Sequence, residues 1–165
     1  MRTKEINVYT FDELSDRAKE RAMNWLLDTI YDWWESTYED AANVGLKLTG
    51  FDIDRGNYCS GEYITSAEDT ATRIVKEHGE SRETYKTASA YLASLATLNA
   101  KEVTEDNEDE LDEEREELDQ ELLKELLEDY LVILRKDYGY QTSEEAARET
   151  CEANEYEFDE NGKIA

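Results

Sequence analysis

The chain has 165 residues, and its 43 Asp and Glu against 18 Lys and Arg give a formal net charge of −25. Direct binding to nucleic acid or to anionic lipid is excluded, because contact with phosphate requires clusters of Lys and Arg and the sequence has none. Eleven Tyr, three Trp and three Phe nevertheless supply enough bulky side chains for one folded core.

The first part of the sequence predicts a strand followed by two helices. Residues 4–9 alternate polar and apolar side chains, as a short strand does, and Thr10 with Glu13 forms the capping box of a helix. A second helix is expected from Asp32 to Val44, with Gly45 as its C-terminal cap. Both helices have an apolar face and are expected to pack on the core.

A β-hairpin is expected next. Residues 46–53 form one strand pattern, with an irregularity at Gly50, and residues 58–64 form the other. The polar residues 54–57 between them are typical of a tight turn, so the two strands are expected to pair antiparallel.

Two further helices follow the hairpin. The first is expected to begin at Ser66, as its N-cap, and to end near Gly79. The second begins after Ser81, has a continuous apolar stripe, and ends at a polar connection over residues 99–107.

A long helix is expected from Glu108 to Tyr138, because apolar residues recur on one face while carboxylates crowd the others. This stripe can pack on the chain's own domain or on a second copy, which leaves a homodimer open. The residues of the stripe are Leu111, Leu118, Leu122, Leu126, Tyr130, Ile133 and Leu134.

The end of the chain predicts a short helix after Ser143 and a strand over residues 156–158. The fold class is therefore α+β, with a small, mostly antiparallel sheet packed against several helices. We expect a single domain over 1–165, made of an α/β core over 1–100, the long acidic helix over 108–138, and a C-terminal helix and short strand over 142–165.

The long helix carries the strongest charge signal in the sequence. Between Glu102 and Asp129 there are sixteen Asp and Glu against one Arg and one Lys. Self-repulsion of this kind opposes folding, so we expect the surface to bind something positively charged. The residues expected to contact that partner are Glu108, Asp109, Asp112, Glu113, Glu116, Glu117, Asp119 and Glu121.

Three alternatives stay open beside this interpretation. The acidic run can be a solvated helix face that only confers solubility. An aromatic patch can instead bind a protein partner, because such interfaces favour Trp and Tyr. A carboxylate pair can support hydrolysis, although 43 acidic residues single out no particular pair. The residues of the aromatic concentration are Trp25, Tyr31, Trp33, Trp34 and Tyr38.

The sequence offers no cofactor motif and little for catalysis. The acidic turn that begins at Asp52 lacks an acidic or amide residue at the fifth position of a calcium loop and the glycine at its sixth position, so no dedicated metal site is expected there. The only histidine, His78, is expected at a helix end on the surface, and no nucleophile elbow, phosphate loop or Cys-x-x-Cys pair is present. We therefore expect neither a cofactor nor enzymatic activity.

Cys59 and Cys151 are far apart in the sequence and are expected to be reduced and structural. The first residues, MRTKEINVYT, contain no apolar signal core, and no apolar run is long enough to span a bilayer. The expected location is the cytoplasm.

Three segments carry a resemblance to a known group of proteins: VYTFDELSDRAKERAMNW, GFDIDRGNYCSG and EANEYEFDENGKI. Together they resemble a family of small, acidic, uncharacterised proteins of bacteriophages and prophages. In its acidic character the chain is also similar to phage DNA-mimic proteins, which block restriction or CRISPR enzymes. The resemblance implies an accessory phage protein in the cytoplasm of a bacterial host, and it brings no catalytic motif.

The carboxylate-rich helix and the resemblance lead to one expectation. The protein docks into a Lys- and Arg-lined groove of a host nucleic-acid-binding protein or defence nuclease and excludes the natural substrate. Such an anti-restriction or anti-CRISPR inhibitor needs no catalytic residue.

Overall fold

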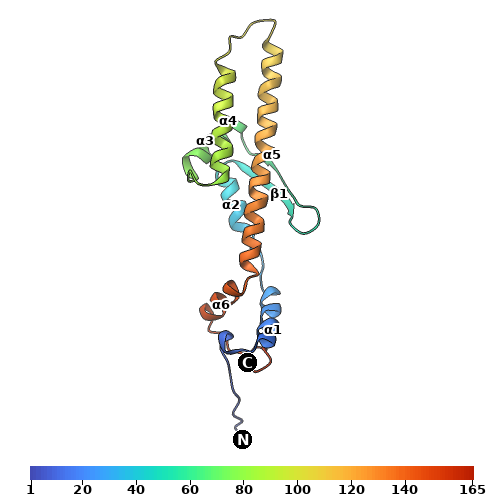
Figure 1. Cartoon of the computed structure of the whole chain (residues 1–165), viewed down its shortest axis with the longest axis vertical. Coiled ribbons are helices and arrows are strands. Elements are labelled where there is room, and N and C mark those ends of the chain that lie inside the picture. The colour runs from blue at the N-terminus through green and yellow to red at the C-terminus, as the bar shows by residue number, and fades with distance from the viewer. The chain divides into compact units, whose positions relative to one another are not determined.

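The computed structural model describes all residues from 1 to 165, and the chain divides into two compact units (Figure 1). The central unit comprises residues 34–135, and the terminal unit comprises residues 1–33 together with 136–165. Each unit has its own cluster of buried side chains. The extent of the expected domain, 1–165, stays a prediction.

The terminal unit contains a short 3₁₀-helix, η1 (Phe11–Glu13), and the helices α1 (Asp16–Leu27) and α6 (Glu144–Ala153). Thr10 and Glu13 form the predicted capping box, but it closes only η1, and Ser15 then caps α1 by accepting the Ala18 N–H at 3.2 Å. The helix therefore begins later than the capping box predicts. The buried side chains of the unit are Phe11, Leu14, Ala18, Ala22, Leu26, Ala147, Cys151 and Phe158.

The prediction of two strands near the ends of the chain is wrong. Residues 4–8 form no strand, and Phe158 makes only isolated antiparallel bridges to Tyr9 and Ile164. Tyr9 and Phe158 exchange two backbone hydrogen bonds of 2.8 Å. Residues 1–8 are exposed, so the alternating pattern has no second element on which to bury its apolar side.

The central unit holds the helices α2 (Glu35–Asn43), α3 (Ala67–Glu77) and α4 (Glu83–Asn99), and most of α5 (Glu108–Gln141). α4 and the first part of α5 lie side by side, joined by residues 100–107 (Figure 1). The buried side chains of this unit are Ala41, Val44, Leu46, Leu48, Ala67, Ala71, Ile74, Ala88, Tyr91, Leu95, Leu122, Leu126 and Tyr130.

The predicted hairpin is confirmed. β1 (Leu46–Asp52) pairs antiparallel with β2 (Tyr58–Tyr63), and the register shifts between Leu48 and Gly50, where the sequence predicts an irregularity. Gly45, with a φ of +93°, forms the turn between α2 and β1 in the left-handed region that glycine favours. The predicted α+β class is confirmed. The sheet consists of these two antiparallel strands alone.

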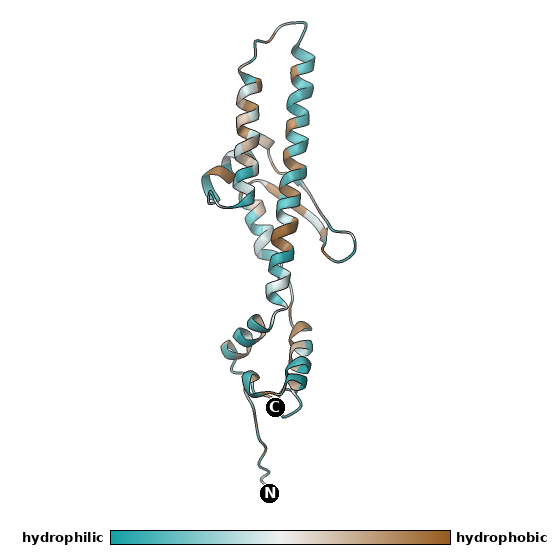
Figure 2. Ribbon diagram, viewed as in Figure 1, coloured by the Kyte–Doolittle hydropathy of each residue, from teal (hydrophilic) through white to brown (hydrophobic).

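The long acidic helix is confirmed and reaches three residues beyond its predicted end, to Gln141. Its apolar face is the predicted one, with Leu118 and Ile133 half-buried and the other five residues of the stripe buried. In the central unit Leu122, Leu126 and Tyr130 join the core with side chains of α4 and β1. The first half of α5 is predominantly hydrophilic outside this face (Figure 2).

Candidate functional site

Seven of the eight carboxylates predicted to contact a partner lie exposed on the first half of α5. Helix α5 positions them, because it is anchored by its own buried leucines and keeps the opposite side free. The seven exposed residues are Glu108, Asp109, Asp112, Glu113, Glu116, Glu117 and Glu121.

Asp119, the eighth residue, has a different environment. Its Oδ1 accepts a hydrogen bond of 2.5 Å from the Tyr91 hydroxyl, and its backbone carbonyl accepts one from the Tyr63 hydroxyl. Burial and the nearby Asp119 charge raise the pKa of both tyrosines above the ordinary value, so both hydroxyls remain donors. Asp119 thereby connects α5 to α4 and to the hairpin, and its contact with a partner stays a prediction.

A ladder of carboxylates four residues apart runs along α5 from Asp109 to Asp129. Each step of four residues advances about 6 Å along the helix axis. Glu125 and Glu114 belong to the same acidic surface and are missing from the predicted set, although the four-residue spacing after Glu121 already points to Glu125. The members of the ladder are Asp109, Glu113, Glu117, Glu121, Glu125 and Asp129.

Few cations neutralise this surface. Arg115 Nη1 lies 3.3 Å from Asp112 Oδ1, and Lys101 Nζ lies 3.6 Å from Glu114 Oε2. These are the only ion pairs between residues 108 and 129 of α5 and any Lys, Arg or His. Most of the carboxylates are therefore free to pair with an external cation.

The ladder also repels itself. Partial burial, followed by the charges of Glu121, Asp129 and Glu128, raises the pKa of Glu125 above its ordinary value. Burial likewise raises the pKa of Asp129, although a hydrogen bond of 2.7 Å from the Thr87 hydroxyl opposes the change. A positively charged partner would relieve this repulsion.

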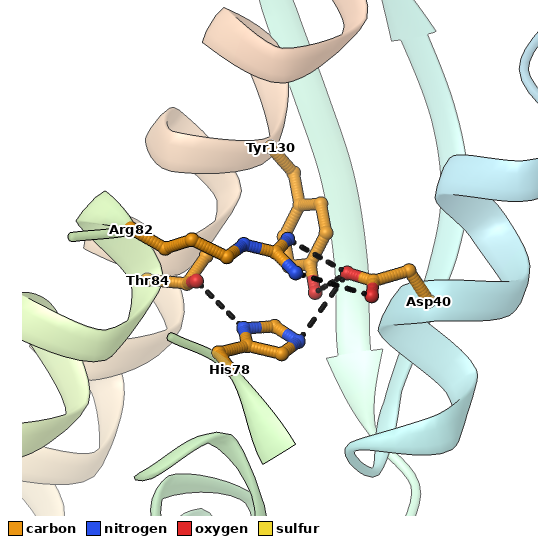
Figure 3. Close-up of polar contacts among 5 residues, drawn as sticks. All are labelled: Asp40, His78, Arg82, Thr84 and Tyr130. Carbon is orange, nitrogen blue, oxygen red and sulfur yellow. Dashed lines mark hydrogen bonds and ion pairs between the residues drawn. The ribbon is translucent and has the colours of Figure 1, made fainter. Parts of the chain in front are cut away.

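A second polar cluster lies inside the central unit, around Asp40 of α2 (Figure 3). Arg82 Nη2 and the Tyr130 hydroxyl each lie 3.0 Å from Asp40 Oδ2. His78 Nε2 lies 3.4 Å from the same oxygen without hydrogen-bond geometry, and its Nδ1 is 2.7 Å from Thr84 Oγ1. Burial raises the pKa of Asp40, but its contacts with His78, Arg82 and Tyr130 outweigh burial and hold that pKa well below the usual value.

The order Thr84, His78, Asp40 resembles a hydrolytic triad, but the geometry does not support catalysis. A nucleophile must reach its substrate, and Thr84 is 1% exposed. The cluster joins α2, the α3–α4 connection, α4 and α5 and is structural. The surface position predicted for His78 is wrong: it caps the C-terminal end of α3 but is buried, because Asp40 and Thr84 give its ring polar neighbours.

The aromatic concentration of the sequence is divided between the two units. Trp33 lies against Tyr138 in the terminal unit, with ring centroids 5.3 Å apart, whereas Trp34 and Tyr38 pack edge-to-face on Phe51 in the central unit. Most of these rings thus contribute to packing. Tyr31 is the most exposed of the five at 78%, followed by Trp25 at 38%.

Metal-ligand geometry is absent. No group of three or more His, Cys, Asp or Glu side chains is placed to hold a metal ion. Asp52, which begins the acidic turn of the hairpin, accepts the backbone N–H groups of Asp54 at 2.9 Å and Arg55 at 3.1 Å, and these bonds lower its pKa. Its carboxylate stabilises the turn.

Comparison with known proteins assigns no relationship. No protein-family model, curated protein or solved structure matches the chain. None of its helices combines the length and the apolar character that crossing a membrane requires.

Proposed function

We propose that the chain is a phage-encoded, non-enzymatic inhibitor of a bacterial defence nuclease, of the restriction or CRISPR type, and that α5 imitates nucleic acid. The observation that carries the proposal is the line of exposed, largely unpaired carboxylates on the first half of α5. The resemblance of three sequence segments to phage proteins supplies the biological setting.

The charge density of the helix is close to that of a nucleic-acid strand. Residues 108–129 hold 13 Asp and Glu against one Arg and one Lys, and they extend over about 32 Å of helix axis. This amounts to about one net charge per 3 Å, while one DNA strand carries one charge per about 3.4 Å. A groove that binds a phosphate backbone therefore meets a similar linear charge.

The helix supports inhibition without any chemical step. Its carboxylates are carried on a continuous backbone that the buried stripe anchors, so little ordering is needed on binding. Lys and Arg in the partner's groove pair with these carboxylates and are no longer available to phosphate. The substrate is excluded by competition.

Nuclease inhibition tests the proposal directly. Purified restriction endonucleases and CRISPR effector complexes are each incubated with the protein and a cleavable DNA, and cleavage is measured against DNA concentration. We expect inhibition of at least one nuclease that excess DNA relieves, because the two ligands compete for one groove.

A matched pair of variants decides whether α5 is responsible. The test variant replaces four exposed carboxylates of α5, and the control variant replaces four exposed carboxylates elsewhere, so that both lose the same charge. Inhibition should be lost in the test variant and kept in the control. If the folded test variant inhibits as well as the unmodified protein, the proposal is wrong. The test substitutions are Asp109→Asn, Glu113→Gln, Glu116→Gln and Glu117→Gln, and the control substitutions are Glu20→Gln, Glu77→Gln, Glu80→Gln and Glu160→Gln.

The alternative is a protein-binding surface in the terminal unit. It is supported by apolar side chains of that unit that stay exposed, with Tyr31 at 78%, Leu27 at 39% and Trp25 at 38%. Affinity through such residues depends weakly on salt, whereas charge mimicry weakens steeply as salt rises. A salt titration of partner binding separates the two functions.

A further inference from the structure

A groove runs between α4 and α5 in the central unit, on the side of the acidic ladder. It has two adjoining parts, with volumes of about 260 Å³ and 160 Å³, which share Ser94, Leu118 and Glu121. From Ala90 to Leu98 on α4 it follows about two helical turns, or about 12 Å, and Lys101 lines its end just beyond the helix.

Side-chain size explains why the groove is open. On its α4 side Ala90 and Ser94 are small and exposed, so the space beside α5 stays unfilled. Leu98 and Leu122, which are buried, and Leu118, which is half-buried, give it an apolar floor.

The α5 wall of the groove is negatively charged. Glu117 and Glu121 line it together with Glu114 and Glu125, at spacings that put all four on one face of the helix. Only Glu114 forms an ion pair, with Lys101 at the end of the groove. The groove thus combines a leucine floor with a wall of four carboxylates, three of which form no ion pair.

This combination fits a particular occupant. An amphipathic helix can place an apolar side chain on the leucine floor while Lys or Arg residues one turn away reach the carboxylates. The long stems of Lys and Arg also cover apolar surface while their charged ends stay at the rim. A phosphate-like surface alone would bind cations but would offer no site for the apolar side chain.

We propose that the α4–α5 groove is the docking site for a basic amphipathic helix of the partner protein. The proposal rests on the function proposed above, since Glu117 and Glu121 belong to both surfaces, and it adds that the partner contributes apolar contacts as well as charge. Charge complementarity selects this occupant over a second copy of the chain, whose net charge of −25 would oppose association through an acidic groove.

Two synthetic helical peptides of about 15 residues test the groove without knowledge of the partner. Both carry the same number of Lys residues, but one has Leu on the face opposite the Lys residues and the other has Ala at those positions. Their affinity for the full-length protein is measured by fluorescence anisotropy. We expect the Leu peptide to bind at least about tenfold more tightly, because burial of one leucine side chain is sufficient for that factor.

Filling the groove provides the decisive variant. Ser94 lies where the two parts of the groove meet and is exposed, so Ser94→Trp occupies the groove without changing the charge. Ala96→Trp is the matched control, since Ala96 is exposed on α4 and does not line the groove. Thr97→Trp, which fills one part of the groove, replaces the first variant if that variant does not fold.

We expect Ser94→Trp to weaken binding of the Leu peptide by about tenfold or more and to change the affinity for the Ala peptide by less than about twofold. Ala96→Trp should change neither affinity. Equal affinity of the two peptides for the unmodified protein, or unchanged binding of the Leu peptide to Ser94→Trp, overturns the groove proposal.

Nuclease inhibition then separates the two proposals. If neutralising α5 abolishes inhibition while Ser94→Trp inhibits fully, charge mimicry stands and the groove proposal is overturned. If Ser94→Trp also loses inhibition and Ala96→Trp keeps it, the groove proposal is supported. If the neutralised protein still inhibits, the proposed function itself is wrong, and the peptide measurements then decide the groove alone.

Discussion

Asp40 shows how one half-buried carboxylate holds several elements together. Replacing it with Asn keeps the shape of the side chain but removes the charge that Arg82 and Tyr130 contact at 3.0 Å. We expect Asp40→Asn to lower the free energy of unfolding by about 1–3 kcal/mol, toward the lower end because 35% of the Asp40 side chain is exposed. Denaturant unfolding measures the loss, and Glu39→Gln is the control because Glu39 is exposed.

The same carboxylate gives a pH dependence of known sign. The pKa of Asp40 in the folded protein lies below the ordinary 3.8, so the folded state binds this proton less readily than the unfolded state. Its stabilising effect is therefore complete above about pH 5 and is lost as the pH falls through the folded-state value. The stability difference between the unmodified protein and Asp40→Asn should shrink between about pH 5 and pH 3. A difference that stays constant or grows over this range would contradict the assignment.

At the scale of elements, the contact between the hairpin and α5 depends on a glycine. A Cβ at Gly61 would lie 2.7 Å from the Lys47 carbonyl oxygen and 3.0 Å from Leu127 Cδ2. Because the Lys47 oxygen belongs to the backbone of β1, the strand would have to move. We expect Gly61→Ala to lower the free energy of unfolding by about 1–3 kcal/mol.

Gly79 provides the matched control for this substitution. Nothing lies within 4 Å of a Cβ placed there. Gly79→Ala should therefore change stability by no more than about 0.5 kcal/mol. Equal effects of the two substitutions in thermal or denaturant unfolding would show that the close approach of β2 to α5 is unimportant.

Elements with local signals could be predicted from the sequence. Ser66 and Ser143 read as helix N-caps, and each accepts a backbone N–H at 3.1 Å, from Asp69 and Ala146 respectively. The isolated bridge between Tyr9 and Phe158 could not be distinguished from a strand pair, because alternation of side chains identifies neither a partner nor the length of the pairing.

The acidic face of the candidate site could be predicted from the sequence, but the groove beside it could not. Helical spacing predicts which carboxylates of α5 share the acidic face. The same spacing puts Asp119 near the apolar stripe, because it lies eight residues after Leu111 and three before Leu122. The groove beside that face depends on Ser94 of α4 as much as on α5. How two helices lie against each other follows from packing of the whole unit, which a single helix pattern does not contain.

For the whole molecule, salt should affect folding and binding in opposite directions. The acidic residues that give the net charge of −25 repel one another within the folded chain, and on α5 the charges of Glu121, Asp129 and Glu128 add to the effect of partial burial in raising the pKa of Glu125. The screening length falls from about 30 Å at 0.01 M salt to about 8 Å at 0.15 M, so added salt weakens this repulsion. Five like-charged steps on the ladder, each worth about 0.2–0.5 kcal/mol, limit the gain in stability to about 1–2.5 kcal/mol.

Denaturant unfolding at the two salt concentrations checks this gain, and the variant with four neutralised carboxylates on α5 should show a smaller one. Affinity for a basic partner should fall over the same range, because each contact exchanges bound counterions and is screened. If the protein becomes more stable and binds more weakly as salt rises, the acidic surface lowers the stability of the fold but raises the affinity for a basic partner. If the stability of both the unmodified protein and the neutralised variant were independent of salt, the carboxylates of α5 would not repel one another in the folded state. The charge density on which mimicry depends would then already be neutralised.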